Sequence, residues 1–287
     1  WYDTQDLRPL APLYISAVRL QDDEYRRWPQ LPAPSMRESP VFVIGFPRSG
    51  TTMLEQMLDA HPALKSMDER PYIQGVVERL PVDYPHELHR LDAAQVDRLR
   101  ADYWDMVAQS VRLAPGQRLV DKNPLNLLRL PMILRLFPQA RIVLALRHPC
   151  DVILSCYMQN FRTPHFASLC KSVESLAAGY TGAMRAWIHH AGLMRPQVMA
   201  LRYEDLLEDF AGHARRLGDF LGLDDVAPML SFDEHARRKG FISTPSYAQV
   251  TEAPHTRAIG RWRRYGELFE PVLPTLQPMF EHWGYGA

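Results

Sequence analysis

The chain has 287 residues, with 33 Lys and Arg against 33 Asp and Glu, so its formal net charge is zero. Its 46% apolar and 23% charged residues exclude a disordered or collagen-like chain and supply the apolar surface for a sizeable core. The neutral balance argues against coating of nucleic acid or of an acidic membrane through bulk charge, but it leaves room for a local basic pocket.

The cysteine pattern bears on the compartment. Three cysteines without C-x-x-C spacing cannot form a disulfide framework, so we expect a reducing compartment and a cytoplasmic location. The longest apolar runs, such as 142–146, are too short to span a bilayer. The chain starts at Trp1 with no initiator Met and no basic segment, from which we expect no signal peptide and a piece cut from a longer protein.

Residues 1–40 are expected to form a lead-in segment, part helix and part linker. The mixed charge of residues 22–27 is typical of a solvated helix face, and prolines gather just before and at Pro40. The main domain is expected to begin at Val41 and to continue to the end of the chain.

Short apolar runs, often bounded by Pro or Gly, predict the buried strands of a sheet. Five strands are expected, over 41–44, 64–67, 118–120, 141–146 and 198–202. Helical spacing predicts helices over 51–60, 93–113, 125–137, 166–191, 205–221 and 270–283, with one more opening at 148–151. Strands that alternate with helices indicate an α/β fold, with a parallel sheet and helices on both of its faces.

The most informative segment is the loop from Gly45 to Thr52, between the first strand and its helix. A turn of backbone N–H groups at the positive end of a helix dipole binds phosphate. Gly45 and Gly50 have the G-x4-G spacing of a P-loop, but Thr51 stands where a P-loop has Lys. Arg48 places a different cation inside the loop, one whose planar fork suits a group with several anionic oxygens.

A glycine-rich turn between a strand and a helix is often nothing more than a turn. Here the strand, the helix, Arg48 and the paired Thr51 and Thr52 all agree with each other, which favours phosphate binding. The missing Lys argues against the hydrolysis of ATP or GTP, because that Lys reaches the β- and γ-phosphates.

Two motifs carry a resemblance to a known family. Residues 47–52 resemble the 5′-phosphosulfate loop of the sulfotransferases that use PAPS (3′-phosphoadenosine-5′-phosphosulfate). Residues 147–155 resemble their 3′-phosphate motif, in which Arg147 and Ser155 stand eight residues apart around a strand-to-helix turn. The resemblance extends over roughly residues 40–286 and implies the P-loop-like sulfotransferase fold for a domain of residues 41–287.

Residues 58–62 resemble one branch of that superfamily, the tyrosylprotein sulfotransferases and the bacterial sulfotransferases with tetratricopeptide repeats. The branch has a catalytic Glu twenty-one residues after the loop Arg, which is Glu69 in this chain. Its catalytic Lys lies in a Lys-Asp-Pro element, and Lys122 stands in the matching place, followed by Asn123 instead of Asp.

The resemblance also implies further contacts with the cofactor. Tyr203 matches a Tyr near the adenine, and Arg261 matches a Lys that precedes a Trp. A late Ser-x-x-Gln-Val element is matched by Ser246, Gln249 and Val250. The residues expected to bind the cofactor are Arg48, Ser49, Gly50, Thr51, Thr52, Arg147, Ser155, Tyr203, Gln249, Val250 and Arg261.

Catalytic roles follow from the same resemblance. Glu69 would take the proton of the acceptor hydroxyl, and Lys122 would stabilise charge on the bridging oxygen as the adenosine bisphosphate leaves. Ser246 would donate a hydrogen bond to the same region, while Arg48 and the loop amides hold the sulfuryl group. No metal is expected, because the donor has no β/γ-phosphate pair to chelate.

Two departures from the family pattern concern arginines. The family has another Arg four residues after the 3′-phosphate Ser, where this chain has Gln159, and Arg162 is the candidate replacement. The family also has an Arg two residues after the catalytic Glu. This chain has Pro71 at that position, with Arg70 directly before it.

Simpler interpretations stay open for several residues. Asp68 is the nearest rival of Glu69 for the base, and most such charged triples lie on the surface. Lys122 could merely end a strand, and Tyr203 could serve packing. His61 and His148 are weaker candidates for a base, because a lone His is usually structural or exposed. His189 and His190, being adjacent, make a poor metal pair.

The sequence therefore predicts an enzyme that moves the sulfuryl group of PAPS to a hydroxyl, with a tyrosine-like phenol on a peptide or protein favoured as acceptor. A glycan or a small alcohol is the alternative acceptor. The rivals from other classes are a P-loop nucleotide kinase or NTPase and a non-catalytic scaffold. We expect no nucleic-acid partner, although arginines surround Trp262. The sequence leaves open whether the chain forms a homodimer.

Overall fold

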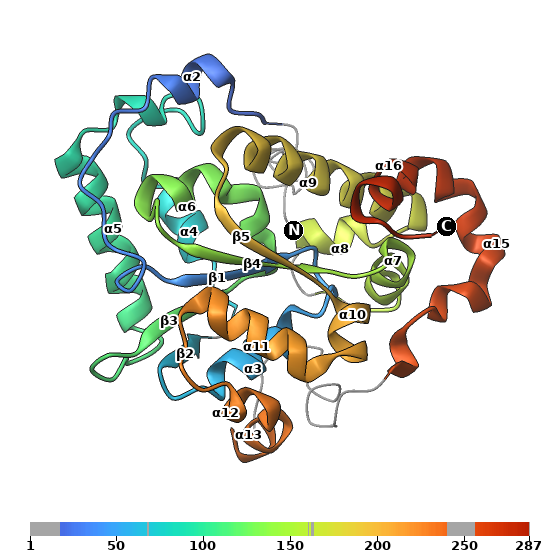
Figure 1. Ribbon diagram of the computed structural model, residues 1–287. Coiled ribbons are helices and arrows are strands. Elements are labelled where there is room, and N and C mark those ends of the chain that lie inside the picture. The colour runs from blue at the N-terminus through green and yellow to red at the C-terminus, as the bar shows by residue number, and fades with distance from the viewer. Residues whose placement is uncertain (1–17, 68, 160, 162–163, 240–255, 287) are drawn as a thin grey trace.

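A five-stranded sheet forms the centre of the computed structural model, which describes residues 18–67, 69–159, 161, 164–239 and 256–286 (Figure 1). All neighbouring strands are parallel, in the order β2-β3-β1-β4-β5. The strands are β1 (Val41–Gly45), β2 (Leu64–Met67), β3 (Arg118–Lys122), β4 (Arg141–Leu146) and β5 (Gln197–Arg202). Because β1 lies between β3 and β4, the loops that follow these three strands lie next to one another.

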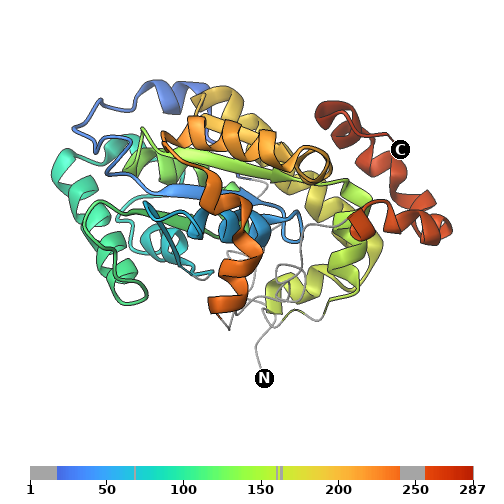
Figure 2. The same cartoon turned by 60° about the horizontal axis from the view of Figure 1, so that its bottom comes forward.

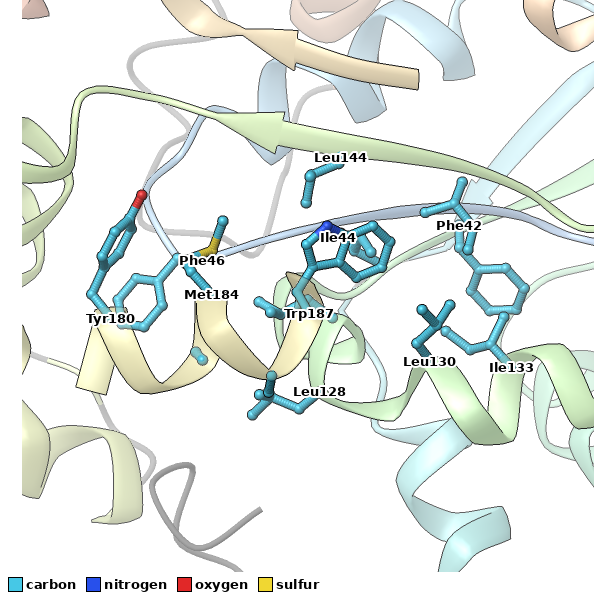
Figure 3. Close-up of a cluster of buried hydrophobic side chains, with 14 of the residues drawn as sticks. Phe42, Ile44, Phe46, Leu128, Leu130, Ile133, Leu144, Tyr180, Met184 and Trp187 are labelled. Atoms are coloured by element: carbon cyan, nitrogen blue, oxygen red, sulfur yellow. The ribbon is translucent and has the colours of Figure 1, made fainter. Parts of the chain in front are cut away.

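Both faces of the sheet are buried at the central strand β1, as its apolar character predicts, whereas the edge strand β5 is largely exposed. Alternate residues point to opposite faces, so Phe42 and Ile44 belong to one core cluster while Val41 and Val43 belong to the other. Figure 3 shows the first cluster, where Phe42, Ile44 and Phe46 lie against side chains of α9 (Val173–Met194) and of α6 (Leu130–Leu136).

Helices cover each face. The helices with residues in the first cluster are α4 (Tyr72–Val77), α5 (Ala93–Ala108), α6 (Leu130–Leu136), α7 (Pro149–Tyr157), α8 (Pro164–Leu169), α9 (Val173–Met194), α15 (Gly266–Phe269) and α16 (Leu273–Trp283). Those with residues in the second are α3 (Thr51–Asp59), α10 (Tyr203–Glu208), α11 (Phe210–Leu221), α12 (Ala227–Leu230) and α13 (Phe232–Lys239). The predicted α/β fold with helices on both faces is confirmed.

The remaining helices are short. They are α2 (Asp22–Arg26), η1 (Leu88–Arg90), η2 (Pro124–Arg129), η3 (Thr256–Ala258), η4 (Arg261–Tyr265) and η5 (Glu270–Val272). The last segments of the chain lie at one end of the molecule, where α16 packs against α7 and α9 (Figure 2).

All five predicted strands are present, but several predicted helices are shorter or divided. The helix expected over 93–113 ends at Ala108, and the one over 125–137 begins as the 3-10 helix η2 before α6. The helix over 166–191 is divided because Ser172 caps the start of α9, accepting a bond from the Ser175 N–H. Likewise Asp209 caps α11 and so divides the helix over 205–221.

The adjacent histidines of α9 hold the lead-in segment. His190 Nε2 accepts a hydrogen bond from the backbone N–H of Leu20 at 3.1 Å, and His189 Nε2 lies 2.8 Å from the carbonyl oxygen of Leu20. Burial lowers the pKa of His190 to about 3, which keeps it in the neutral form that can accept this bond. Across the part of the chain that the structure describes, no helix has both the length and the apolar character to cross a membrane.

Candidate active site

The phosphate loop has a backbone that few residues other than glycine tolerate. Gly50 has φ +96° and precedes α3, and a Cβ added to it would lie 2.9 Å from the Tyr203 ring. A Cβ on Gly45 would lie 2.6 Å from the Ala145 carbonyl oxygen. Arg48, which is not a glycine, has φ +73°. Strain of this kind is found where a loop must keep one shape to bind a ligand.

The start of α3 faces this loop. No side chain caps the helix, and Thr51 and Thr52 are buried in its first turn. Ser49 is buried just before it. The N–H groups of a helix's first turn carry the positive end of its dipole, so the loop and helix together form a site suited to an anion.

A second part of the site lies where β4 ends and α7 begins. Arg147 donates to the carbonyl oxygen of Arg48 at 3.3 Å and to that of Ala258 at 2.6 Å. Its guanidinium carbon lies 5.1 Å from the centre of the Tyr203 ring. The Oγ of Ser155, two helical turns further on, accepts a bond from Arg48 Nε at 3.0 Å. The two phosphate motifs predicted from the sequence are therefore in direct contact.

A small pocket joins these motifs to a late segment of the chain. Arg147, Ser155 and Arg261 all line it, with Asp151, Leu154, Met158 and Ala258. Arg261 reaches it because Asp151 holds the segment: its carboxylate accepts bonds from Gly260 N (2.7 Å) and Trp262 N (3.0 Å). The pocket therefore has arginines from two parts of the chain and a hydroxyl from α7, which suits a phosphate.

Lys122 and Glu69 form the third part of the site. Lys122 ends β3 in register with Val43, so its side chain is on the α3 face of the sheet. Its Nζ lies 2.7 Å from Glu69 Oε1 and 3.2 Å from Glu55 Oε2. The side chains of Lys122 and Glu55 are 0% and 2% exposed, whereas that of Glu69 is 42% exposed.

The electrostatics keep these cations charged. Burial acts to lower the pKa of Lys122, but Glu55 and Glu69 outweigh it and hold the pKa above its ordinary value. Burial lowers the pKa of the Arg48 guanidinium, and Glu69 is one of the charges that act in the opposite direction. A guanidinium stays charged after such a shift, so the site has two fixed cations near one accessible carboxylate.

Most of the predicted site residues come together, and some are outside the described part of the chain. Arg48, Ser49, Gly50, Thr51 and Thr52 form the loop, and Arg147, Ser155, Tyr203 and Arg261 surround it. Ser246, Gln249 and Val250 lie outside the described residues, as do Asp68 and Arg162. Their predicted roles stay predictions.

The rival residues have structural contacts. His148 caps α7, accepting a bond from the Cys150 N–H, and stacks on Trp262; His61 Nδ1 accepts a bond from the Ala63 N–H. The carbonyl oxygen of Arg70 accepts a bond from Asn123 Nδ2 at 3.0 Å, and Pro71 directly precedes α4. Asn123 thus joins the segments that carry Lys122 and Glu69.

Two residues of the site were missed in the sequence. Glu55 pairs with Lys122, and Asp151 fixes the segment of Arg261. The available signal for Glu55 was its place in α3, one turn after Thr51. Among the described residues, no three His, Cys, Asp or Glu side chains gather in a way that could hold a metal ion.

Known proteins share this arrangement of sheet, loop and helices. The model of the sulfotransferase family matches residues 40–228. An uncharacterized protein of Aquifex aeolicus is 30% identical over 262 residues, which make up 86% of this chain but only 33% of that protein. A putative protein-tyrosine sulfotransferase of Caenorhabditis briggsae is 26% identical over 230 residues, 78% of this chain and 81% of the relative.

A solved structure agrees with the fold. The sulfotransferase domain from the Synechococcus PCC 7002 olefin synthase has a TM-score of 0.63 at 22% identity, covering 90% of this chain and 100% of that domain. The chain spans about one third of the Aquifex relative, so it corresponds to one part of that longer protein. On the family match, which covers both phosphate motifs and the Lys122–Glu69 pair, this chain belongs to the sulfotransferase family.

Proposed function

We propose that this chain moves the sulfuryl group of PAPS to a hydroxyl, and that the acceptor is a tyrosine-like phenol on a peptide or protein. The contact of Lys122 with Glu69, 2.7 Å apart, carries the proposal. It places a carboxylate that can accept a proton beside a cation that can stabilise a leaving oxygen. Lys122 also pairs with Glu55, which lies on α3, the helix that begins at the phosphate loop. The Lys122–Glu69 pair is thereby held close to a loop that suits an anion.

The residues present fit the proposed cofactor. When bound, it supplies an activated sulfuryl group on a 5′-phosphate, together with a distinguishing 3′-phosphate. The Nε of Arg147 is buried and has no hydrogen-bond partner among the described residues, and this side chain lines the pocket with Ser155 and Arg261. These three would hold the 3′-phosphate, and the loop amides with Arg48 would hold the other end.

The chain's own residues then divide the work of transfer. Glu69 takes the proton as the acceptor O–H bond breaks, and the acceptor oxygen forms the new bond to sulfur. Lys122 would donate a hydrogen bond to the 5′-phosphate oxygen that leaves the sulfuryl group, where negative charge develops. Arg48 offsets charge on the sulfuryl oxygens, so that catalysis rests on position and electrostatics. Ser246 is proposed for the same region as Lys122.

The proposed phenol acceptor is supported by similarity to a putative protein-tyrosine sulfotransferase and by the exposure of Glu69, whose side chain is 42% accessible. The test is a screen with labelled sulfate donor against tyrosine peptides, small phenols, small alcohols and glycans. We expect transfer to the peptides and phenols. Transfer to glycans or small alcohols alone would contradict the proposed phenol acceptor but would still support sulfuryl transfer to a hydroxyl.

A variant of Glu69 tests the proposed base. Glu69→Ala should lower the turnover number by about 10²- to 10⁴-fold, the range in which a positioned base contributes. Calorimetric binding of adenosine-3′,5′-bisphosphate should stay within about twofold of wild type, because Glu69 holds none of its phosphates. Arg70→Ala is the neighbouring control, since the bond recorded for this residue is made by its backbone carbonyl, which the substitution keeps. Turnover that survives in Glu69→Ala would move the role to Asp68 or a histidine.

The nucleotide-kinase alternative loses its support. The family match places the chain among transferases of sulfate, and Thr51 is buried where a P-loop would need its Lys. Magnesium-dependent hydrolysis of ATP by the purified chain would revive that alternative. The cytoplasmic location stays a prediction.

A further inference from the structure

Two carboxylates from different elements hold the ammonium group of Lys122. Glu69 comes from the segment after β2 and lies 2.7 Å from Nζ, while Glu55 comes from α3 and lies 3.2 Å from it. The two differ in their access to solvent: the Glu69 side chain is 42% exposed and that of Glu55 is 2% exposed. Only Glu69 can therefore meet an acceptor from outside while Glu55 stays in place.

In the proposed reaction Glu69 turns toward the acceptor hydroxyl and becomes neutral when it takes the proton. Lys122 would then lose one counterion at the moment when its charge is needed. Its side chain is fully buried, and burial favours loss of the proton from an ammonium group. A second carboxylate that cannot leave would prevent this loss.

We propose that Glu55 is a positioning residue that keeps Lys122 charged and aimed at the leaving oxygen while Glu69 works as the base. This role rests on the proposed function. Glu55 lies one turn after Thr51 in the helix that starts at the phosphate loop, so it also fixes Lys122 relative to that loop. The carboxylate that activates the acceptor and the one that stabilises the cation are thus separate groups.

Few other charges act on Lys122 among the described residues. Asp121 is next to it on β3 but is in register with Phe42, so it points to the opposite face, where Tyr103 donates to it at 2.8 Å. Arg48 faces Glu69. Asp59, one turn further along α3, lies 3.7 Å from Lys65 and 3.1 Å from His235. Asp121 also interacts electrostatically with Lys122, but Glu55 and Glu69 are the carboxylates that form ion pairs with its Nζ and hold its pKa up.

The pH profile of turnover tests the proposal. The acidic limb should follow the base Glu69 and the alkaline limb should follow Lys122. Glu55→Gln should move the alkaline limb down by at least about one pH unit and leave the acidic limb and the binding of adenosine-3′,5′-bisphosphate nearly unchanged. Glu55→Asp keeps the negative charge but moves it one methylene away from Lys122. The alkaline limb of this variant should therefore lie between those of wild type and Glu55→Gln.

A direct measurement of the charge needs no activity. The chain has four lysines, at 65, 122, 171 and 239, so labelling lysine with ¹³C at Cε gives a spectrum of four signals. In Glu55→Gln the Lys122 signal should titrate at least about one pH unit lower than in wild type, with exposed Lys171 as internal reference. Asp59→Asn is the matched control: it removes another buried acid of α3 and should leave the Lys122 signal unchanged.

The outcomes separate the two proposals. An unmoved Lys122 signal in Glu55→Gln, or an equal loss of turnover at every pH, would overturn the positioning role. A wild-type chain that transfers sulfate to no acceptor would overturn the proposed function instead. If Glu55→Gln does not fold, Glu55→Asp is measured in its place, both for the pH profile of turnover and for the titration of the Lys122 signal.

Discussion

Arg147 shows how one side chain can join separate parts of a site. It follows β4, donates to backbone carbonyls of the phosphate loop and of η3, and lies over the ring of Tyr203. It is 7% exposed, and its Nε faces no hydrogen-bond acceptor among the described residues. A bound phosphate would satisfy that nitrogen, so much of the binding energy should depend on this residue.

Arg147→Ala should weaken the binding of adenosine-3′,5′-bisphosphate at least 100-fold, about 2.7 kcal/mol, because loss of one partner of a buried charged contact typically costs 2–5 kcal/mol. Titration calorimetry measures it. Arg141→Ala is the control, since Arg141 starts the same strand at its opposite end and bonds Gln197. Unchanged affinity in Arg147→Ala would contradict the assignment of the 3′-phosphate pocket.

At the scale of elements, the site depends on short turns after β1, β3 and β4. Each turn starts from a parallel strand whose register is fixed by its neighbours, so the three turns meet at one edge of the sheet. The turn after β1 needs Gly50, since φ +96° and the nearby ring of Tyr203 both oppose a side chain. Tyr203 opens α10 directly after β5, so it brings a fourth strand end to the same place.

Gly50→Ala should destabilise the fold by about 1–3 kcal/mol and weaken nucleotide binding, because the loop must give up its backbone shape or displace Tyr203. Gly116→Ala is the matched control: that glycine also has positive φ, +82°, but an added Cβ meets nothing within 4 Å. Urea unfolding of both variants isolates the cost of the ring contact. Equal destabilisation would show that Tyr203 does not hold the loop.

At the scale of the whole molecule, a buried carboxyl makes stability depend on pH. Asp121 is 0% exposed and accepts bonds from Tyr103 and Asn126. Burial raises its pKa to about 7, although Tyr103 and Lys122 act in the opposite direction. The folded chain therefore keeps a proton that the unfolded chain, with an ordinary Asp, loses near pH 4.

The sign of the effect follows from this difference. Between about pH 4 and about pH 7 the folded state binds more protons, so the free energy of unfolding falls as pH rises, by a few kcal/mol in total. Asp121→Asn cannot titrate, so its stability relative to wild type should improve between pH 5 and pH 8. Urea unfolding at both values measures this, with exposed Asp105→Asn as control. A constant difference would show that Asp121 is charged throughout.

Much of the fold could be predicted because its signals are local. The apolar runs of β1 and β4, the turn residues Gly45 and Gly50, and the eight-residue spacing of Arg147 and Ser155 lie within short segments. The division of helices at Ser172 and Asp209 was missed. There a single side-chain cap decides against an otherwise continuous helical pattern.

The alternation of strands and helices and the anion-binding turn could be read from the amino-acid order alone, because periodicity and glycine placement act over a few residues. The candidate pair Glu69 and Lys122 came from the resemblance to the sulfotransferases. The pairing of Glu55 with Lys122 and the hold of Asp151 on the backbone beside Arg261 became visible in the folded chain. The latter contact joins residues 111 positions apart in the chain. Such contacts depend on strand order and on which face of the sheet each side chain takes, and a linear pattern does not contain either.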